Sequence, residues 1–321
     1  MRFWLHMVPL AGAAIAAIAV AQQYPARPVR IYIPFTAGSA ADIIARALEP
    51  QMREKLGQSL IIDNRGGAGG NIAAELTAKS PADGYSVMMG TVGTHAINLS
   101  LYSKLPYHPQ RDFTPIALVG ESPNILVINP YVPAQSIKEL IALGKANPGK
   151  LNYGSSGSGT TVHLSAELFS VMTGIKMVHV PYKGASEALT ALLSGQTDLQ
   201  FASLSSGIPL VKAGRLRAFA VTGEKRSPSI PEMPTMSEAA LPGYAASAWF
   251  GLLGPAGMPP AAVTALSNAA LASLQTQEVK DRLFASGVEL RPMPPDEFTR
   301  LIDVEIKKWA QVVKASGAKV D

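Results

Sequence analysis

The chain has 321 residues, of which 47% are hydrophobic and 16% charged, with 28 Lys and Arg against 23 Asp and Glu. It contains no cysteine, which excludes disulfides, thiolate metal sites and cysteine nucleophiles. The formal charge of +5 is dispersed along the chain without a basic stripe that carries interleaved aromatics, so we expect no nucleic-acid binding.

Residues 1–21 are typical of a secretory signal peptide. Arg2 supplies a positive start, an apolar stretch runs from Val8 to Val20, and Ala19-Val20-Ala21 fits the small-x-small rule for cleavage. We expect cleavage after Ala21, which removes one of the 28 basic residues and leaves 27 against 23 acidic ones. A retained membrane anchor is the alternative, although this stretch is shorter than the ~20 residues that span a bilayer. An exported chain without a lipid-modified cysteine is predicted to lie in the periplasm.

Short apolar strands alternate with helical patterns along the remaining chain, which predicts an α/β fold with largely parallel sheets. The first helix, up to Leu56, places Ile44, Leu48 and Met52 on one face. The last helix begins at 294–297, where proline and acidic residues suit a first helical turn. The expected strands are 29–34, 59–63, 85–90, 116–120, 124–129, 176–181, 198–203 and 216–222.

The length of the exported chain predicts two lobes, because it exceeds what one hydrophobic core usually holds. Two apolar extended segments, 123–130 and 245–255, are expected to cross between the lobes as a hinge pair. Lobe 1 is then residues 22–122 plus 250–321, and lobe 2 is residues 123–249. Two lobes in simple sequence order are the alternative.

A loop of small residues, 34–42, joins the first strand to the first helix. The first N–H groups of a helix are unpaired and carry partial positive charge, so such a turn can hold an anion. Ser39 and Asp42 also have the spacing of a capping box, and a purely structural role for Asp42 is the alternative. The candidate ligand-binding residues of this loop are Thr36, Ala37, Gly38, Ser39 and Asp42.

A second turn of the same kind, 154–161, has three glycines and five hydroxyl residues before a helix. It lacks the Gly-Lys-[Ser/Thr] ending of a P-loop, and the G-x-S-x-G elbow of hydrolases is absent as well. Hydroxyls and free N–H groups that converge at a helix start suit a carboxylate, whereas a flexible surface loop is the alternative. The candidate residues here are Ser155, Ser156, Gly157, Gly159, Thr160 and Thr161.

Other motifs carry weaker signals. The glycine-rich segment 65–71 lacks dinucleotide-fingerprint spacing and predicts a tight strand-to-helix crossover. The histidines are scattered, without an H-E-x-x-H motif, so we expect neither a metal nor a cofactor. Tyr182 and Lys183 follow a strand, and Lys183 could reach a cleft or be a solvated surface lysine. A hydrolase that pairs a serine of 155–158 with His163 is an alternative function.

A series of ordered motifs resembles one known family, the solute-binding proteins of tripartite tricarboxylate transporters, also called Bug proteins. The resemblance spans nearly the whole exported chain. Its motifs are Tyr24–Arg30, Ile33–Gly38, Asp63–Gly70, Pro81–Tyr85, Asn98–Tyr102, Leu105–Tyr107, Asn147–Ser155, His179–Gly184, Leu216–Ala218, Pro231–Thr235 and Trp249–Gly251.

The resemblance implies a two-lobed, type II-like periplasmic binding fold, each lobe a mixed, mostly parallel sheet flanked by helices. It implies a non-enzymatic, monomeric receptor that closes on a small organic acid and delivers it to membrane permease subunits. A membrane sensor as partner is the alternative. Thr94, Tyr182 and Phe201 are expected to shape the cleft. Ser203 stands in the segment 201–203 where the family often has Phe-Asp, which puts amino-acid ligands in doubt.

Overall fold

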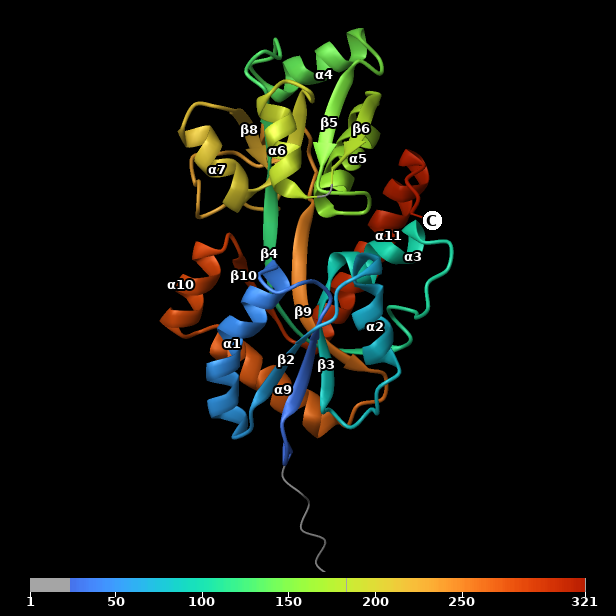
Figure 1. The fold of residues 1–321 in the computed structure, drawn as a ribbon, viewed down its shortest axis with the longest axis vertical. Helices are drawn as coiled ribbons and strands as arrows, with labels where there is room; N and C mark the ends of the chain where they lie inside the picture. Colours follow the sequence, from blue (N-terminus) through green and yellow to red (C-terminus); the bar gives the residue numbers. More distant parts are fainter. Residues whose placement is uncertain (1–23, 183, 321) are drawn as a thin grey trace, which may run out of the picture.

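The computed structural model describes residues 24–182 and 184–320. The predicted signal peptide and Lys183 lie outside the described residues. Two lobes lie one above the other in Figure 1, and two long strands, β4 and β9, run through the region between them. Among the described residues no helix is both long and apolar enough to cross a membrane.

The lower lobe in Figure 1 is built on a mixed sheet whose strands run in the order β2-β1-β3-β9-β4. The three strands on one side are parallel to one another, whereas β9 pairs antiparallel with both β3 and β4. A further strand, β10, pairs antiparallel with β4. The bounds are β1 Val29–Ile33, β2 Leu60–Asn64, β3 Ser86–Thr91, β4 Phe113–Ile128, β9 Ser247–Pro255 and β10 Glu289–Met293.

The upper lobe continues from the same long strand. Residues 113–123 of β4 pair with β9, and residues 124–128 pair with β7 and β8 instead. Strand β5 lies parallel to both β6 and β7. The bounds are β5 Leu151–Ser155, β6 Met177–Pro181, β7 Leu199–Ser203 and β8 Arg217–Val221.

Helices flank both sheets, as the sequence predicts for an α/β fold (Figure 1). One core lies between the lower sheet and the helices α1, α9 and α10. Another core runs from α2 and α11 into the upper lobe and includes α5. The bounds are α1 Ala40–Leu56, α2 Asn71–Ala78, α3 Asn98–Leu101, α4 Ile137–Ala146, α5 Thr161–Thr173, α6 Ala185–Leu193, α7 Leu204–Lys212, α8 Met236–Ala239, α9 Pro260–Ser273, α10 Gln277–Ala285 and α11 Pro295–Ser316.

The predicted helices are confirmed at both ends of the chain. Ile44, Leu48 and Met52 of α1 are buried, as the 3.6-residue spacing requires. Helix α11 begins at the predicted proline pair, and its Phe298 ring packs edge-on against Trp249 with centroids 5.3 Å apart. The C-terminal helix therefore packs on the strand β9 that precedes it by about 40 residues.

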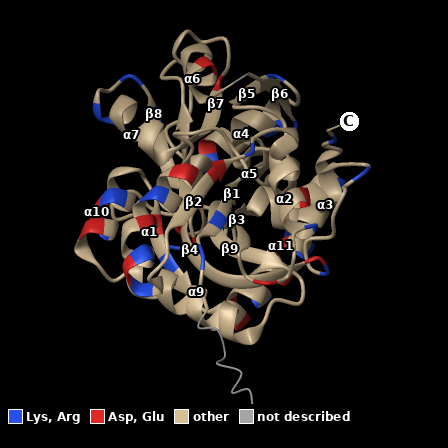
Figure 2. Cartoon of the chain, turned by 60° about the horizontal axis from the view of Figure 1, so that its bottom comes forward, with Lys and Arg blue, Asp and Glu red and all other residues tan. Residues whose placement is uncertain are grey.

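The strand predictions were right in position but incomplete. The segments 116–120 and 124–129 form one strand, β4, because residues 121–123 between them pair with Trp249, Ala248 and Ser247 of β9. Strand β10 was not expected, since its pattern of exposure along Glu289–Met293 shows no clear alternation. Charged residues of both signs are interspersed over α1 and α10 (Figure 2), in agreement with the dispersed charge of the sequence.

Candidate functional site

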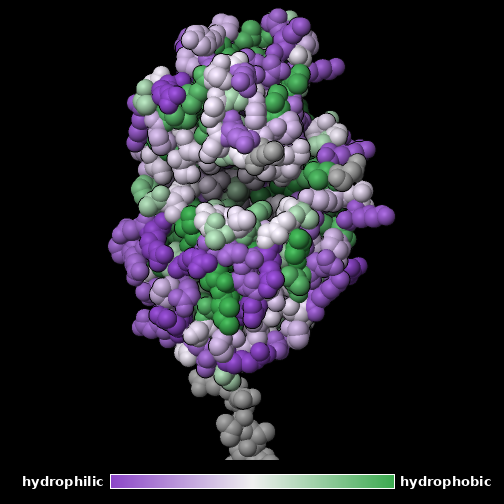
Figure 3. All heavy atoms as spheres, in the orientation of Figure 1, coloured by the Kyte–Doolittle hydropathy of each residue, from purple (hydrophilic) through white to green (hydrophobic). Residues whose placement is uncertain are grey.

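A cavity of about 290 Å³ lies between the lobes, where the space-filling view shows a hollow (Figure 3). Both predicted strand-to-helix turns contribute to its lining, from α1 below and α5 above. It is lined by Phe35, Ala40, Ala41, Gly69, Thr91, Val92, Gly93, Ile97, Asn98, Leu101, Tyr102, Ser156, Ser158, Gly159, Thr160, Thr161, Val162, Ala248 and Phe250.

The start of α1 presents its first turn to the cavity. Ser39 is the N-cap, and its hydroxyl accepts a hydrogen bond from the Asp42 amide at 3.4 Å. Ala40 and Ala41 occupy the first two helical positions, whose N–H groups have no partner inside a helix. Both residues line the cavity, so the positive end of the α1 dipole lies at its wall.

Asp42 does not face the cavity. Its carboxylate is buried and accepts hydrogen bonds from the Gly38 amide at 2.9 Å, from Arg46 Nε at 3.0 Å and from Asn64 Nδ2 at 3.0 Å. Burial alone would raise the pKa of this carboxyl, but these hydrogen bonds and the charge of Arg46 lower it. The carboxylate is thus folded back on its own loop, where it does not repel an anion in the cavity.

Hydrogen bonds within the first loop occupy two of the amides that the sequence predicts to be free for a ligand. The Gly38 amide is taken by Asp42, and the Ser39 amide donates to the Thr36 carbonyl at 3.2 Å. Thr36 and Ala37 are exposed and lie outside the cavity lining. Ligand contacts by Thr36–Ser39 and Asp42 stay predictions, while Phe35, Ala40 and Ala41 supply the cavity wall on this side.

Replacing Asp42 with Asn should destabilise the fold by about 1.5–3 kcal/mol, because it removes a buried charge that accepts several hydrogen bonds. Urea denaturation measures the change. The control is Glu49→Gln on the same helix, whose partner Arg53 is exposed and 3.8 Å away; we expect less than about 1 kcal/mol there. Equal losses in the two variants would contradict a supporting role for Asp42.

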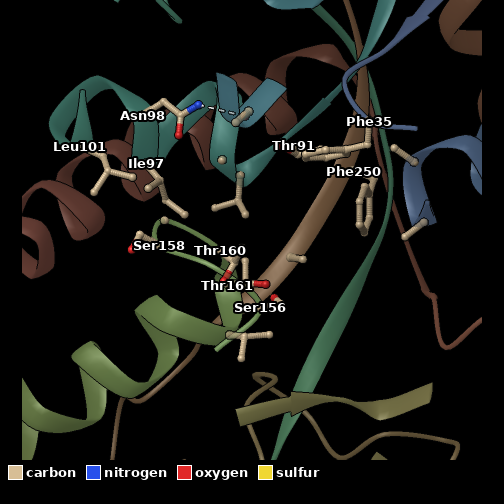
Figure 4. A pocket seen from close by; sticks show the side chains of 18 of the residues that line it. Phe35, Thr91, Ile97, Asn98, Leu101, Ser156, Ser158, Thr160, Thr161 and Phe250 are labelled. Atoms are coloured by element: carbon tan, nitrogen blue, oxygen red, sulfur yellow. Dashed lines mark hydrogen bonds between the residues drawn. The ribbon is translucent and has the colours of Figure 1, made fainter. Parts of the chain in front are cut away.

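The start of α5 presents a matching turn from above. Thr160 is the N-cap and accepts a hydrogen bond from the His163 amide at 3.3 Å. Thr161 and Val162 occupy the first two helical positions and line the cavity. Figure 4 shows Ser156, Thr160 and Thr161 together on this loop. Two helix starts therefore border one cavity, an arrangement that favours a bound anion.

A buried cluster behind the second loop fixes its shape. His163 Nδ1 accepts a hydrogen bond from the Gly159 amide at 3.0 Å, and the His163 ring stacks on His179 with centroids 4.0 Å apart. Ser155 Oγ lies 2.6 Å from His179 Nε2 and accepts a hydrogen bond from the Gly157 amide at 3.2 Å. The loop amides at Gly157 and Gly159 are thereby bound to the protein itself.

Both imidazoles of this cluster are held neutral. Burial lowers the pKa of His163 to about 3, with a smaller contribution from His179, and burial lowers the pKa of His179 to about 4. Burial also raises the pKa of Glu167, which accepts a hydrogen bond from Tyr153. A neutral His163 can accept from the Gly159 amide, whereas an imidazolium cannot.

The serine–histidine pairing in this loop differs from the one that the hydrolase alternative requires. Ser155 pairs with His179 rather than His163, and Ser155 is fully buried. Ser156 lines the cavity, but His163 Nδ1 is already engaged by the Gly159 amide. His163 Nε2 lies 3.7 Å from Glu167 Oε1, so the serine–His163 pair that the hydrolase alternative requires is not formed among the described residues.

Four further predicted residues lie outside the cavity lining. Thr94 is fully buried, with Oγ1 2.8 Å from His95 Nδ1, and Phe201 packs in the core against Phe169. Ser203 Oγ lies 2.6 Å from Ser206 Oγ, and Tyr182 lines a separate surface hollow beside α6. Direct ligand contacts by these residues stay predictions.

The sequence predicted one residue of the turn after β3, Thr94, but not the residues of this turn that line the cavity. Thr91, Val92 and Gly93 follow β3, and this strand lies parallel to β1, so both strands end at the same edge of the sheet. Ile97, Asn98 and Leu101 continue the wall on the helical turns after them (Figure 4). The signal was available, because a strand followed by Thr-Val-Gly-Thr reads as another strand-to-helix turn.

The described residues contain no group of three or more His, Cys, Asp or Glu placed to hold a metal ion. The cavity itself is lined by apolar side chains, hydroxyls, one side-chain amide and glycines. Its chemistry is that of a binding site for a small molecule, with main-chain donors concentrated at the two helix starts.

Comparison with known proteins finds one family model and similar proteins over nearly the whole chain. Residues 44–318 match the family described as the tripartite tricarboxylate transporter family receptor, TctC. Protein BugT of Bordetella pertussis is 36% identical over 97% of this chain and 96% of its own length.

Solved structures of similar proteins have the same fold as this chain. Rpa4515 of R. palustris, with adipate, is 39% identical at a TM-score of 0.78, covering 92% of this chain and 98% of that one. MatC of Rhodopseudomonas palustris, with bound malate, is 33% identical at a TM-score of 0.76, covering 90% of this chain and all of that one. The predicted two-lobed binding-protein fold is thereby confirmed. The chain belongs to the TctC family of tripartite tricarboxylate transporter receptors.

Proposed function

We propose that this protein is a periplasmic receptor that binds a small carboxylate in the cavity between its lobes and delivers it to a tripartite transporter. The observation that carries the proposal is the meeting of two helix starts, at Ala40–Ala41 and Thr161–Val162, on one cavity. Unpaired amides at helix starts stabilise negative charge without a cationic side chain. Relatives with adipate and with malate support an organic acid as ligand.

Binding is proposed to favour closure of the lobes, with residues 22–122 plus 250–321 as lobe 1 and 123–249 as lobe 2. The change of strand partners within β4 between residues 123 and 124 supports this boundary. A ligand that contacts both helix starts binds the closed state better than the open one, and only such a difference shifts the equilibrium.

The partner is proposed to be the membrane permease of the transporter, and the receptor to act as a monomer without catalysis. Export, with cleavage after Ala21, would bring the chain to the periplasm. A membrane sensor could read the same closed form. Capture of the ligand-loaded protein by membranes that contain the permease, and not by membranes that lack it, separates these two partners.

A thermal-shift panel of organic acids tests the proposed function. At 100 times its dissociation constant a ligand stabilises the folded protein by about 2.7 kcal/mol, so we expect a rise in melting temperature of several degrees with at least one acid. The matching alcohols and amides serve as controls, because they keep the carbon skeleton and lose the negative charge. Equal shifts with acid and amide, or none with any acid, would contradict the proposal.

A further inference from the structure

A groove of about 750 Å³ lies beside β4, apart from the ligand cavity. The loop after β8 in the upper lobe lines one side of it, and α10 and β10 of the lower lobe line the other (Figure 1). The described residues that line the groove are all different from those that line the cavity. Because the groove has walls from both lobes, the contacts across it depend on the angle between the lobes.

An arginine in this groove forms an ion pair with a carboxylate on each wall. Arg291 belongs to β10, and its Nη1 lies 2.7 Å from Glu121 Oε2 on the neighbouring strand β4. Its Nη2 lies 3.1 Å from Glu224 Oε2, in the loop after β8. The first pair lies within the lower lobe, whereas the second joins the two lobes.

The lower lobe holds the guanidinium in place. The side chains of Arg291 and Glu121 are only 25% and 12% exposed, and their strands pair beside them, with Glu289 opposite Glu121. Since the planar guanidinium is already fixed by Glu121, little side-chain freedom remains to be lost when it meets Glu224. The interlobe pair therefore costs less entropy than a pair between two free surface side chains.

The upper lobe fixes the position of Glu224. Thr222, two residues before it, donates its amide to the Asn124 carbonyl at 2.8 Å and its hydroxyl to the Ala246 carbonyl at 2.5 Å. Both partners lie where the chain crosses between the lobes. Because Arg291 is held from below and Glu224 from above, a rotation of one lobe against the other separates the two charges.

The lobes also touch across the ligand cavity in this arrangement. Gly159 of the second loop lies so close to the lower wall that an added Cβ would be 2.4 Å from Leu101 Cδ2. Both helix starts border the one cavity, as the proposed function requires. An ion pair that is present in this arrangement, and lost when the lobes move apart, stabilises the arrangement.

We propose that the ion pair between Arg291 and Glu224 is a latch that favours the ligand-binding arrangement of the lobes. This inference rests on the proposed function, to which it adds a contact outside the cavity that tunes affinity. Glu224 is 57% exposed, so water and salt screen the pair. Removing a pair of this kind changes an equilibrium by up to about fivefold, so the ratio of closed to open protein should fall by about two- to fivefold.

Distances between spin labels test the latch without any ligand. The chain has no cysteine, so one label can be attached to each lobe through Glu54→Cys on α1 and Lys145→Cys on α4, both exposed (Figure 1). In this labelled protein Glu224→Gln should lower the closed-to-open ratio by about two- to fivefold. The control is Glu232→Gln, the same change of charge at an exposed residue of the same loop, which should leave the ratio unchanged.

Ligand affinity provides a second readout. The apparent Kd rises as the closed fraction of the free protein falls, so Glu224→Gln should weaken binding of the tightest acid in the thermal-shift panel. The loss reaches the same factor of about two to five when the free protein is mostly open. When it is mostly closed, the distances show the effect instead. The two readouts together therefore cover both cases.

Arg291→Gln tests whether the effect of Glu224 passes through this partner. In the Arg291→Gln background, Glu224→Gln should have no further effect, because the pair is already absent. The latch would be overturned if Glu224→Gln matched Glu232→Gln in both readouts, or if it kept its full effect without Arg291. The comparison between the two glutamate variants holds however Arg291→Gln folds. Binding of no acid would contradict the proposed function, and the distances in the free protein would still decide the latch.

Discussion

Replacing Gly159 with Val is expected to weaken ligand binding at least about 100-fold while the protein stays folded. Gly159 has φ of +80°, a conformation that a β-branched residue adopts only under strain. An added Cβ would also lie 2.4 Å from Leu101 Cδ2, on the opposite wall of the cavity. The loop must then move away from α3, and the first turn of α5 moves with it. Calorimetry with the tightest acid found measures the loss.

The control for backbone strain is Gly149→Val. Gly149 has φ of +72°, its added Cβ would meet nothing within 4 Å, and it lies before β5 and outside the cavity lining. Backbone strain should cost both variants about 1–2 kcal/mol of stability, and the contact with Leu101 adds to the loss in Gly159→Val, but only Gly159→Val should lose binding. Unaltered affinity in Gly159→Val would show that the second loop does not hold the ligand.

The sequence predicted most elements of the fold because its local signals agree with its tertiary structure. The capping spacing of Ser39 and Asp42 predicted the start of α1, and the Ser39 hydroxyl accepts from the Asp42 amide. Ser136 and Thr235 cap α4 and α8 in the same way, each accepting from the amide three residues on. Strands with buried, β-branched residues were found for the same reason. Strand β10 and the middle of β4 were not, since β10 pairs with β4 and the middle of β4 pairs with β9, and each of these partners is more than 100 residues away in the chain.

The site was predicted only in part, because a helix start can be located from sequence but its exact contacts cannot. Of the candidate ligand-binding residues of the second loop, Ser156, Gly159, Thr160 and Thr161 line the cavity. On the first loop the lining shifts to Ala40 and Ala41, because the carboxylate of Asp42 takes the amide of Gly38. Which acceptor a loop amide finds is decided by the folded backbone, and residue spacing alone does not determine it.

Three histidines, the buried His95 and His163 and the half-buried His179, should make the stability of the protein depend steeply on pH. Burial lowers the pKa of His95 to about 3, that of His163 to about 3 and that of His179 to about 4, from the usual 6.5. The unfolded chain takes up protons at these sites as the pH falls through 6.5, and the folded chain does not. Stability conferred by the neutral imidazoles is thus fully present above pH 6.5 and is lost as the pH falls toward 4.

We expect each of the two buried imidazoles, His95 and His163, to lower the free energy of unfolding by about 1.4 kcal/mol for each pH unit below 6.5. Glu167 opposes this in part, because burial raises its pKa and the folded state takes up a proton there. Urea denaturation at pH 7, 6 and 5 should show a free energy of unfolding that falls steadily. In His163→Gln the fall per pH unit should be smaller by about 1.4 kcal/mol, because this variant lacks one of the protonation sites. A His163→Gln protein with the wild-type slope would contradict this account of the buried cluster.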